Sequence, residues 1–282
     1  MRLTRRALLV AAPALALGRI ARAAAPRRIV SLNPCLDAIL LRLADAPHVA
    51  ALSHYARDVH TSTIAAEALR FPFTYETAEE IVALQPDLVL ASRHTAIATR
   101  TALARMGIPF ALFGVPDTVE ESLDQIAEIA ALCGAEPRGG ALIGEIRAAI
   151  AASAPQPGRP AIEALILQGR GLAAGAGTLL DEMLTRTGFT NVAARYGVSY
   201  WGNVPLELLV ADPPQLLLAG AANAGAPDQA QRLLSHPALA AVSGRMARAS
   251  FPETLFYCGG PVLLQTAARL AAARDAFWAS RA

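Results

Sequence analysis

Residues 79–91 read Glu79-Glu-Ile-Val-Ala-Leu-Gln-Pro-Asp-Leu-Val-Leu-Ala91, and the phrase returns 128 residues later as Glu207-Leu-Leu-Val-Ala-Asp-Pro-Pro-Gln-Leu-Leu-Leu-Ala219. In both copies a glutamate stands seven residues before a proline, in the first turn of an expected helix. Proline ends a helix because it lacks a backbone N–H, and the apolar run after it is typical of a strand buried on both faces. The repeat predicts a helix that leads into a buried strand in each half, and it favours an internal duplication.

The same alternation of strand and helix extends outward from both copies. Apolar runs predict strands at 28–33, 49–53, 87–91, 110–113, 162–167 and 215–218, and helical patterns cover 36–43, 96–106, 179–187, 206–210 and 262–278. Thr77 with Glu80 forms a capping-box pattern before a further helix. Between the halves, residues 119–153 are helical in pattern, with Gly134 and Pro137 separating two segments. We therefore predict an α/β fold with two parallel-sheet, Rossmann-like lobes joined by a single long helix.

Four segments follow from this organisation. We expect an export signal at 1–25, an N-terminal α/β lobe at 26–136, a connecting helix at 137–158 and a C-terminal α/β lobe at 159–282. The first segment begins with a basic stretch (Arg2, Arg5, Arg6), followed by an apolar stretch at 7–17 and small residues for cleavage near Ala23–Ala25. An uncleaved membrane anchor is disfavoured, because this apolar stretch is shorter than the roughly 20 residues that a spanning helix needs.

The signal resembles the twin-arginine type around Arg5 and Arg6, and an ordinary secretory route stays open.

Charge is divided unevenly between the signal and the rest of the chain. All 25 cationic side chains are arginines, and five of them lie in the first 25 residues, where no acid occurs. The remainder holds more acids than arginines and no basic run after Arg28, so a nucleic-acid partner is disfavoured. The absence of lysine excludes phosphate-loop, Schiff-base and lysine general-base chemistry.

Three cysteines allow one disulfide and leave one thiol over. They are Cys35, Cys133 and Cys258, and their separations match no metal-finger spacing. An exported protein meets an oxidising compartment, so a pair such as Cys35–Cys258 is one interpretation, and buried free thiols are the other.

Seven phrases, in order along nearly the whole chain after residue 26, carry a resemblance to a known family. They are Arg28-Ile-Val-Ser-Leu-Asn-Pro34, Ala78-Glu-Glu-Ile-Val-Ala-Leu-Gln-Pro-Asp-Leu-Val-Leu90, Leu103-Ala-Arg-Met-Gly-Ile-Pro109, Gly175-Ala-Gly-Thr-Leu-Leu180, Gly188-Phe-Thr-Asn-Val192, Leu206-Glu-Leu-Leu-Val210 and Gly260-Pro261. The chain resembles the periplasmic substrate-binding proteins of ABC importers for ferric siderophores, haem and cobalamin. The resemblance implies a periplasmic, monomeric and non-enzymatic carrier that binds a metal chelate between two lobes joined by a rigid helix.

The resemblance also implies a membrane partner. In the family, one glutamate on each lobe docks onto arginines of a twofold-symmetric inner-membrane permease, and Glu79 and Glu207 match these positions. Two equivalent acids suit two equivalent basic pockets, because complementary charges orient an encounter. The competing interpretation is that both glutamates only stabilise the N-termini of their helices.

Six residues are candidates for contacting the ligand. Tyr55, Trp201 and Arg93 match family positions or lie where relatives place such residues; Arg170 follows a predicted strand, and Tyr200 and Arg57 neighbour other candidates. The aromatic rings suit stacking on a flat or bulky ligand, and the arginines suit pairing with carboxylate or catecholate oxygens. Two simpler interpretations stay open: Trp201 as a core residue and Arg57 as a solvated one.

The chelate itself is left open between a ferric siderophore and a corrinoid, with haem as an alternative. Some relatives carry a tryptophan where this chain has Ser92, followed by Arg93, and this departure weakens the cobalamin assignment in favour of an anionic chelate. For haem, tyrosine and histidine are known axial ligands, and the candidates are His54, Tyr55, His60 and His94. No resident cofactor or metal site is predicted.

Two rivals from other classes remain. Gly169-Arg-Gly-Leu-Ala-Ala174 formally satisfies a dinucleotide fingerprint of oxidoreductases, but no acid follows about 20 residues later, as that fingerprint requires. A ligand sensor of the same fold, without transport, is the second rival. A hydrolase is disfavoured because the chain has no Gly-x-Ser-x-Gly elbow.

Overall fold

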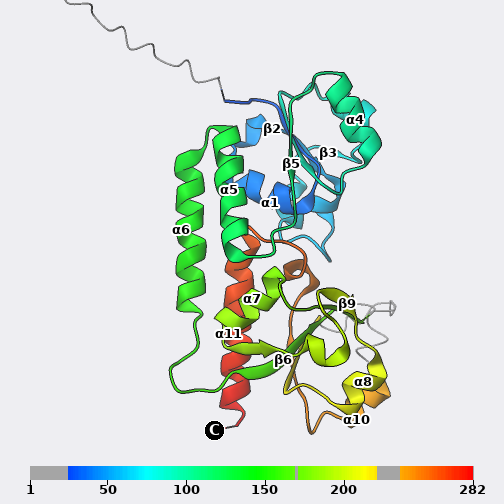
Figure 1. The fold of residues 1–282 in the computed structure, drawn as a ribbon. Helices are drawn as coiled ribbons and strands as arrows, with labels where there is room; N and C mark the ends of the chain where they lie inside the picture. Colours follow the sequence, from blue (N-terminus) through cyan, green and yellow to red (C-terminus); the bar gives the residue numbers. More distant parts are fainter. Residues whose placement is uncertain (1–24, 169–170, 221–235, 282) are drawn as a thin grey trace, which may run out of the picture.

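Buried apolar strands form two separate sheets, one in each half of the chain. The computed structural model describes residues 25–168, 171–220 and 236–281 (Figure 1). The first sheet has the order β3-β2-β1-β4-β5, and all of its pairings are parallel. Its strands are β1 (Ile29–Ser31), β2 (Val49–Ser53), β3 (Phe73–Thr74), β4 (Leu88–Ser92) and β5 (Phe110–Phe113).

The second sheet has the order β11-β10-β6-β7-β9, with β8 also paired to β6. Its strands are β6 (Ile162–Leu167), β7 (Leu172–Ala174), β8 (Phe189–Asn191), β9 (Trp201–Asn203), β10 (Leu216–Ala219) and β11 (Ala247–Ser250). The pairs of β6 with β8 and β10, and of β10 with β11, are parallel, whereas β7 runs antiparallel to both β6 and β9. The predicted α/β class with two lobes is confirmed. The antiparallel strands β7 and β9 were not predicted.

Helices cover these sheets. In the first half they are α1 (Pro34–Leu43), η1 (Ala46–His48), η2 (His54–Arg57), α2 (Ala65–Ala68), α3 (Ala78–Ala83) and α4 (Ile97–Arg105). In the second half they are α7 (Leu179–Arg186), η4 (Ala193–Tyr196), α8 (Leu206–Ala211), α10 (Pro237–Ala241), η5 (Glu253–Leu255) and α11 (Val262–Ala279). None of the helices in the described ranges is long and apolar enough to cross a membrane.

The repeated phrase occupies equivalent places in the two sheets. In the first copy α3 leads into β4, which lies between β1 and β5; in the second α8 leads into β10, which lies between β6 and β11. The predicted N-cap of the first copy is confirmed, because the Thr77 hydroxyl accepts a hydrogen bond from the Glu80 backbone N–H at 3.3 Å. Equivalent topology supports the duplication that the sequence repeat indicates.

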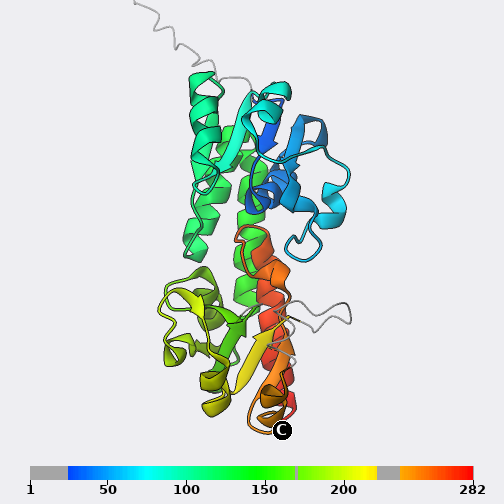
Figure 2. The ribbon, with the colours of Figure 1, turned by 90° about the vertical axis from the view of Figure 1, so that its right-hand side faces the viewer.

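Two antiparallel helices connect the first sheet to the second along the chain, α5 (Val119–Cys133) and α6 (Glu136–Ala152). Gly134, in the left-handed conformation that glycine adopts most readily, separates them. Helix α6 packs on α5 and α1 and also on α11 of the second half, so it runs along the side of both lobes (Figures 1 and 2). It ends at Ala152, earlier than the predicted limit of the connecting helix at 158.

A buried arginine caps the C-terminal end of the connecting helix α6. Arg274 of α11 is 7% exposed and donates to the carbonyl oxygens of Ser153 and Thr187 at 2.7 and 3.0 Å. These carbonyls terminate α6 and α7, where backbone oxygens lack partners within the helix. One guanidinium therefore joins three helices at this end of the connector.

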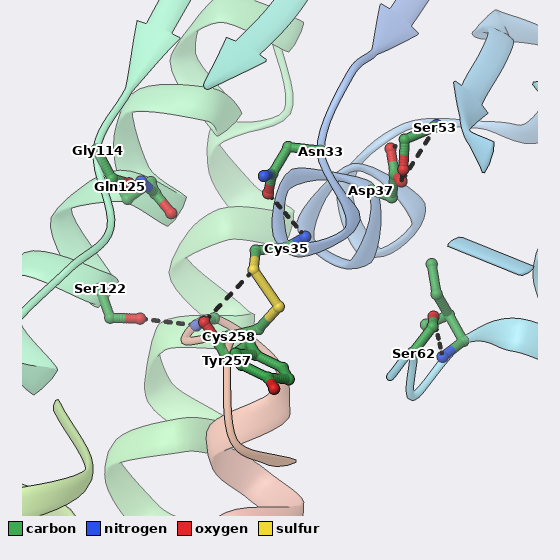
Figure 3. Close-up of a disulfide and its surroundings, with 12 residues drawn as sticks. Asn33, Cys35, Asp37, Ser53, Ser62, Gly114, Ser122, Gln125, Tyr257 and Cys258 are labelled. Atoms are coloured by element: carbon green, nitrogen blue, oxygen red, sulfur yellow. Dashed lines mark hydrogen bonds between the residues drawn. A yellow bond between two sulfur atoms is a disulfide. The ribbon is translucent and has the colours of Figure 1, made fainter. Parts of the chain in front are cut away.

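The two halves are also joined where the segment before α11 meets α1 and α5. Cys35 and Cys258 form a disulfide, and the Ser122 hydroxyl accepts from the Gly260 backbone N–H at 2.7 Å (Figure 3). The first of the two cysteine interpretations is thus the one in the structure. Cys133 is a buried free thiol, and burial raises its pKa to about 11.

Residues 1–24 of the predicted export signal at 1–25 lie outside the described residues, so the export signal stays a prediction.

The carboxyl group of Asp37 is fully buried beside β2. The Asp37 carboxylate accepts from the Ser53 hydroxyl at 2.5 Å and from the Ser53 backbone N–H (Figure 3). Burial raises the pKa of Asp37 to about 8, against the opposing effect of these hydrogen bonds.

The Asp37 environment predicts a pH dependence of stability. The folded protein retains a proton on Asp37 that the unfolded chain releases near pH 4, so this group's stabilising contribution is lost as the pH rises from about 4 to about 8. Asp37→Asn cannot titrate. We expect its free energy of unfolding, relative to wild type, to increase between about pH 5 and about pH 8 in urea titrations. The exposed Asp124→Asn on α5 is the control, and a difference for Asp37→Asn that does not change with pH would contradict the expectation.

The disulfide predicts a second stability effect. Cys258→Ser releases a crosslink between residues 223 apart, so the unfolded chain gains freedom and the free energy of unfolding should fall by about 2–5 kcal/mol. Urea unfolding of wild type with and without reductant should reproduce the difference. Cys133→Ala is the matched control, since it removes a buried thiol without removing a crosslink, and its stability should not respond differently to reductant from wild type.

Candidate functional site

The carboxyl ends of the central strands of the first sheet open onto a pocket that the second half closes. This is the position at which parallel open sheets bind ligands. The pocket has a volume of about 370 Å³. It is lined by residues at or after the ends of β1, β2, β3 and β4 and by two residues of the segment before α11: Leu32, Asn33, Pro34, Tyr55, Thr61, Glu76, Ser92, His94, Thr95, Tyr257 and Cys258.

A smaller pocket of about 20 Å³ adjoins the first and shares two of its lining residues. Its lining comes from the loop after β5, from α7, from β9 and from the segment before α11: Val115, Pro116, Asp117, Leu179, Leu180, Trp201, Phe256, Tyr257, Cys258 and Leu263. Tyr257 and Cys258 line both pockets. We call the first the large pocket and the second the small pocket.

Aromatic rings approach the pockets from both halves. In the second half, ring centroids lie 6.2 Å apart for Tyr200 and Trp201, 5.3 Å for Trp201 and Phe256 and 5.1 Å for Phe256 and Tyr257, each pair close to perpendicular. In the first half, the ring centroids of Tyr55 and His54 lie 3.8 Å apart. Edge-to-face packing fixes the rings of the second half relative to one another and leaves Trp201 and Tyr257 partly exposed.

The structure places the predicted aromatic residues around the two pockets. Tyr55 is half exposed and lines the large pocket, directly after β2. Trp201 begins β9, is 37% exposed and lines the small pocket, which differs from a fully buried core residue. The Tyr200 hydroxyl donates to the Asp117 carboxylate, which lies in the first half between β5 and α5. This bond, whose acceptor is a carboxylate, raises the pKa of Tyr200.

Of the predicted arginines, Arg57 and Arg93 lie in the described ranges, and neither lines the large pocket. Arg57 donates to the Phe71 carbonyl at 2.5 Å and stacks over the Phe73 ring at 4.3 Å, so it is engaged within its own lobe. Arg93 is exposed beside Gly114 at the end of β4, and within the described ranges its guanidinium makes no hydrogen bond or ion pair. Arg170 lies outside the described residues.

Glu76 and Tyr257 line the large pocket and were not among the candidates. Glu76 follows β3 with a positive φ of 69°, a backbone conformation that a sequence pattern does not announce for glutamate. Burial raises its pKa to about 7. Tyr257 reaches the pocket from a segment more than 160 residues away in sequence from the walls of the first half, and the Cys35–Cys258 bond holds it there. The neighbouring Cys258 was the one available signal in the sequence.

The histidines considered for haem iron separate in the structure. His94 lines the large pocket, whereas His54 and His60 do not. The Nδ1 atom of His54 is buried without a hydrogen-bond partner among the described residues, and His60 is exposed. No group of three or more metal-ligating side chains occurs in the described ranges. The large pocket thus offers isolated phenol, imidazole and carboxyl groups, which suit hydrogen bonding or a single ligation rather than a closed metal site.

Glu79 and Glu207 lie in the first turns of α3 and α8, and both are exposed.

The segment that formally matches the dinucleotide fingerprint does not have the geometry that this fingerprint requires. Gly171 leads into strand β7, which runs antiparallel to β6, whereas the fingerprint requires a helix that begins within the glycines. The local structure therefore does not form a dinucleotide-binding turn.

Comparisons with known proteins agree with this geometry. A family model described as periplasmic binding protein matches residues 29–244. The chain is 26% identical over 199 residues to a cobalamin-binding protein of Halobacterium salinarum, a match that covers 69% of the chain and 54% of the relative. The chain therefore spans about half the length of the curated relatives it matches.

Solved structures share the fold. A periplasmic haem-binding protein from Roseiflexus sp. RS-1 superposes with a TM-score of 0.68 at 24% identity, covering 89% of this chain and 99% of that one. A periplasmic haem-binding protein from Pseudomonas aeruginosa gives 0.70 at 22% identity, covering 90% and 94%. The vitamin B12-binding protein BtuF of Vibrio cholerae gives 0.66 at 17% identity, covering 90% and 98%. With the family model matching most of the chain, the protein belongs to the family of periplasmic binding proteins.

Proposed function

We propose that this protein is the periplasmic substrate-binding component of an ABC importer, which binds a metal chelate between its lobes and delivers it to the permease. The observation that carries this proposal is the large pocket, which combines strand ends of the first half with Tyr257 and Cys258 of the second. Its volume of about 370 Å³ lies within the range of small-molecule sites. A ligand there contacts both lobes at once, as a carrier requires.

Tyr55 and Tyr257 are the aromatic walls of the large pocket, and Trp201 is the aromatic wall of the small one. Rings on walls from different lobes suit a broad, partly apolar ligand such as a corrinoid, haem or a ferric siderophore. Arg93, near the end of β4, has no hydrogen-bond or ion-pair partner for its guanidinium among the described residues, and we assign it to an anionic group on the ligand. Tyr200 and Arg57 become contacts only if the ligand displaces their present partners.

A specific observation favours haem as the second candidate. Tyr55 and His94 line the same pocket, and both residue types ligate haem iron. Tyr257 is a poorer iron ligand, because burial and the adjacent Glu253 raise the pKa of its phenol. Its hydroxyl donates to Glu253 at 2.9 Å. A haem iron in this pocket would therefore meet Tyr55 or His94.

Support for the chelate class comes from several relatives. The curated match is named a cobalamin-binding protein, and solved structures of the same fold are described as haem-binding, vitamin B12-binding and Fe3+-hydroxamate transport proteins. Docking on the permease is assigned to Glu79 and Glu207. They occupy equivalent exposed positions in the two halves, so they can meet two equivalent arginine sites on a twofold-symmetric permease.

The first test is a binding screen with hemin, cyanocobalamin, a ferric hydroxamate and a ferric catecholate, each titrated into the protein that starts at Ala25. The bound chelate should quench tryptophan emission through Trp201. Trp201→Phe should remove most of the quenching. Trp278→Phe is the matched control and should retain it, because Trp278 lines a separate cavity at the far end of α11. Quenching that survives in Trp201→Phe would place the ligand elsewhere.

The same titrations distinguish the contacts. Tyr55→Ala should weaken binding of the matching chelate by about 3- to 10-fold, the effect expected from the loss of one aromatic contact. If hemin is that chelate, Tyr55→Phe and His94→Ala identify the iron ligand, since only the true ligand's loss changes the haem absorbance spectrum. An affinity unchanged in Tyr55→Ala would contradict the placement.

Docking predicts a separation of uptake from binding. The double variant Glu79→Arg with Glu207→Arg should abolish uptake of the chelate in cells while its affinity in solution equals that of wild type, because both side chains are exposed and lie outside the pockets. Asp124→Arg with Glu128→Arg, exposed on α5, is the matched charge reversal and should support normal uptake. Uptake that survives in the first variant would overturn the docking assignment.

A further inference from the structure

The large and small pockets adjoin at two consecutive residues of the segment before α11. Tyr257 and Cys258 line both pockets, which differ in volume from about 370 to about 20 Å³. The remaining lining of the large pocket comes from the first half. The small pocket adds Trp201 and Phe256 from the second half. A ligand in the large pocket and a ligand beside Trp201 would therefore both contact Tyr257.

Tyr257 is held in place through both of its neighbours and its hydroxyl. Phe256 is buried, and its ring lies perpendicular to that of Tyr257 at 5.1 Å. Cys258 is bonded to Cys35 at the start of α1 (Figure 3). The hydroxyl donates to Glu253, in the 3₁₀ helix η5. The backbone before and after the ring is thus tied to a packed core on one side and to the opposite lobe on the other.

The two glycines after Cys258 leave this segment no room to shift toward the first half. A methyl group on Gly259 would lie 2.5 Å from the Ser122 hydroxyl oxygen, and one on Gly260 would lie 2.7 Å from Ile39. Gly260 also has a positive φ of 61° and donates its N–H to Ser122. The backbone therefore lies directly against α1 and α5, and the disulfide joins it there covalently.

The disulfide has a consequence beyond stability, because its two ends belong to different lobes. Every other wall of the large pocket that could face Tyr257 belongs to the first half, and Cys35 lies in that half. The bond therefore fixes the distance between the Tyr257 ring and the opposing walls of the pocket. Without it, hydrogen bonding by Ser122 and apolar packing remain, and both can be exchanged for contacts with water or ligand.

We propose that Tyr257, positioned by the Cys35–Cys258 disulfide, divides the cleft between the lobes and determines which chelates fit. The ring excludes bulky chelates from the space beside Trp201 and favours those that fit the large pocket alone. This specificity role rests on the proposed function, since it concerns the same ligand site. The division of the cleft is a property of the unliganded protein and is testable without any chelate.

The first test therefore uses no ligand. In a Trp278→Phe background Trp201 is the only tryptophan, and its emission reports on access to the small pocket. Tyr257→Ala should raise the acrylamide quenching constant of Trp201 by about twofold, because a side chain that separates it from the large pocket is lost. Tyr257→Phe keeps the ring and should match the Trp278→Phe parent. Reduction of the disulfide should raise the constant in the parent, and Cys258→Ser should reproduce that value without reductant.

The second test measures selectivity with two named probes, hemin and cyanocobalamin. The ratio of their dissociation constants should shift toward cyanocobalamin, the bulkier probe, by about tenfold in Tyr257→Ala. It should shift in the same direction in Cys258→Ser and stay at the wild-type value in Tyr257→Phe. The ratio is insensitive to a uniform loss of affinity, so a variant that is merely less stable does not imitate the effect.

The outcomes separate the two proposals. A quenching constant that is unchanged in Tyr257→Ala overturns the division of the cleft, whatever the protein binds. A raised constant with an unchanged ratio of dissociation constants overturns the specificity role. If no chelate of the binding screen binds wild type or any variant, the proposed function falls, and the quenching measurement still decides whether Tyr257 divides the cleft.

Discussion

The structure depends on the contact between the segment Phe256–Gly260 and the helices α1 and α5. There the chain of the second half is joined to the first by the Cys35–Cys258 disulfide and by the Ser122–Gly260 hydrogen bond. A continuous apolar core runs beneath this contact, from the first sheet through α5 and α6 to α11. Because the core is shared, separating the lobes would expose apolar surface, which costs about 25 cal/mol for each Å². The junction thus holds both lobes in the relation that creates the pocket between them.

Polar contacts also join the two lobes beside the cleft. The backbone N–H of Val119, at the start of α5, donates to the Glu182 carboxylate of α7 at 2.6 Å, where the helix dipole also favours a negative charge. Tyr200 reaches Asp117 from the opposite lobe. Tyr200 is exposed and Asp117 and Glu182 are half-buried, so these side chains can exchange their contacts for ligand contacts more readily than the core beneath them. One side of the molecule, formed by α6, α11 and the disulfide, holds the lobes together. The polar contacts on the cleft side can be exchanged. This combination suits the proposed carrier, which must bind and release a ligand.

Much of the fold is predictable from the sequence because its signals are local. Strands such as Leu88–Ser92 and Leu216–Ala219 are buried on both faces, so they read as unbroken apolar runs, and prolines or N-cap threonines limit the neighbouring helices. The β7–β9 pair was missed because Trp201–Asn203 is largely exposed and has no apolar run. In the site, Tyr55 was predictable since it directly follows a strand at the ligand edge of the sheet. Glu76 and Tyr257 were not, because a left-handed backbone and a disulfide bring them to the pocket.

The sequence by itself determined the two α/β halves, the helical connector between them, the repeated glutamates and the resemblance to binding proteins of importers, because hydrophobic period, capping and proline position act within a few residues. Only the tertiary structure decided which cysteines pair and which ring divides the cleft. It also decided that Arg57 is bound within its own lobe while Arg93 is exposed to solvent. Those outcomes depend on where segments up to 223 residues apart meet, and that is set by the packing of α5, α6 and α11 into one core.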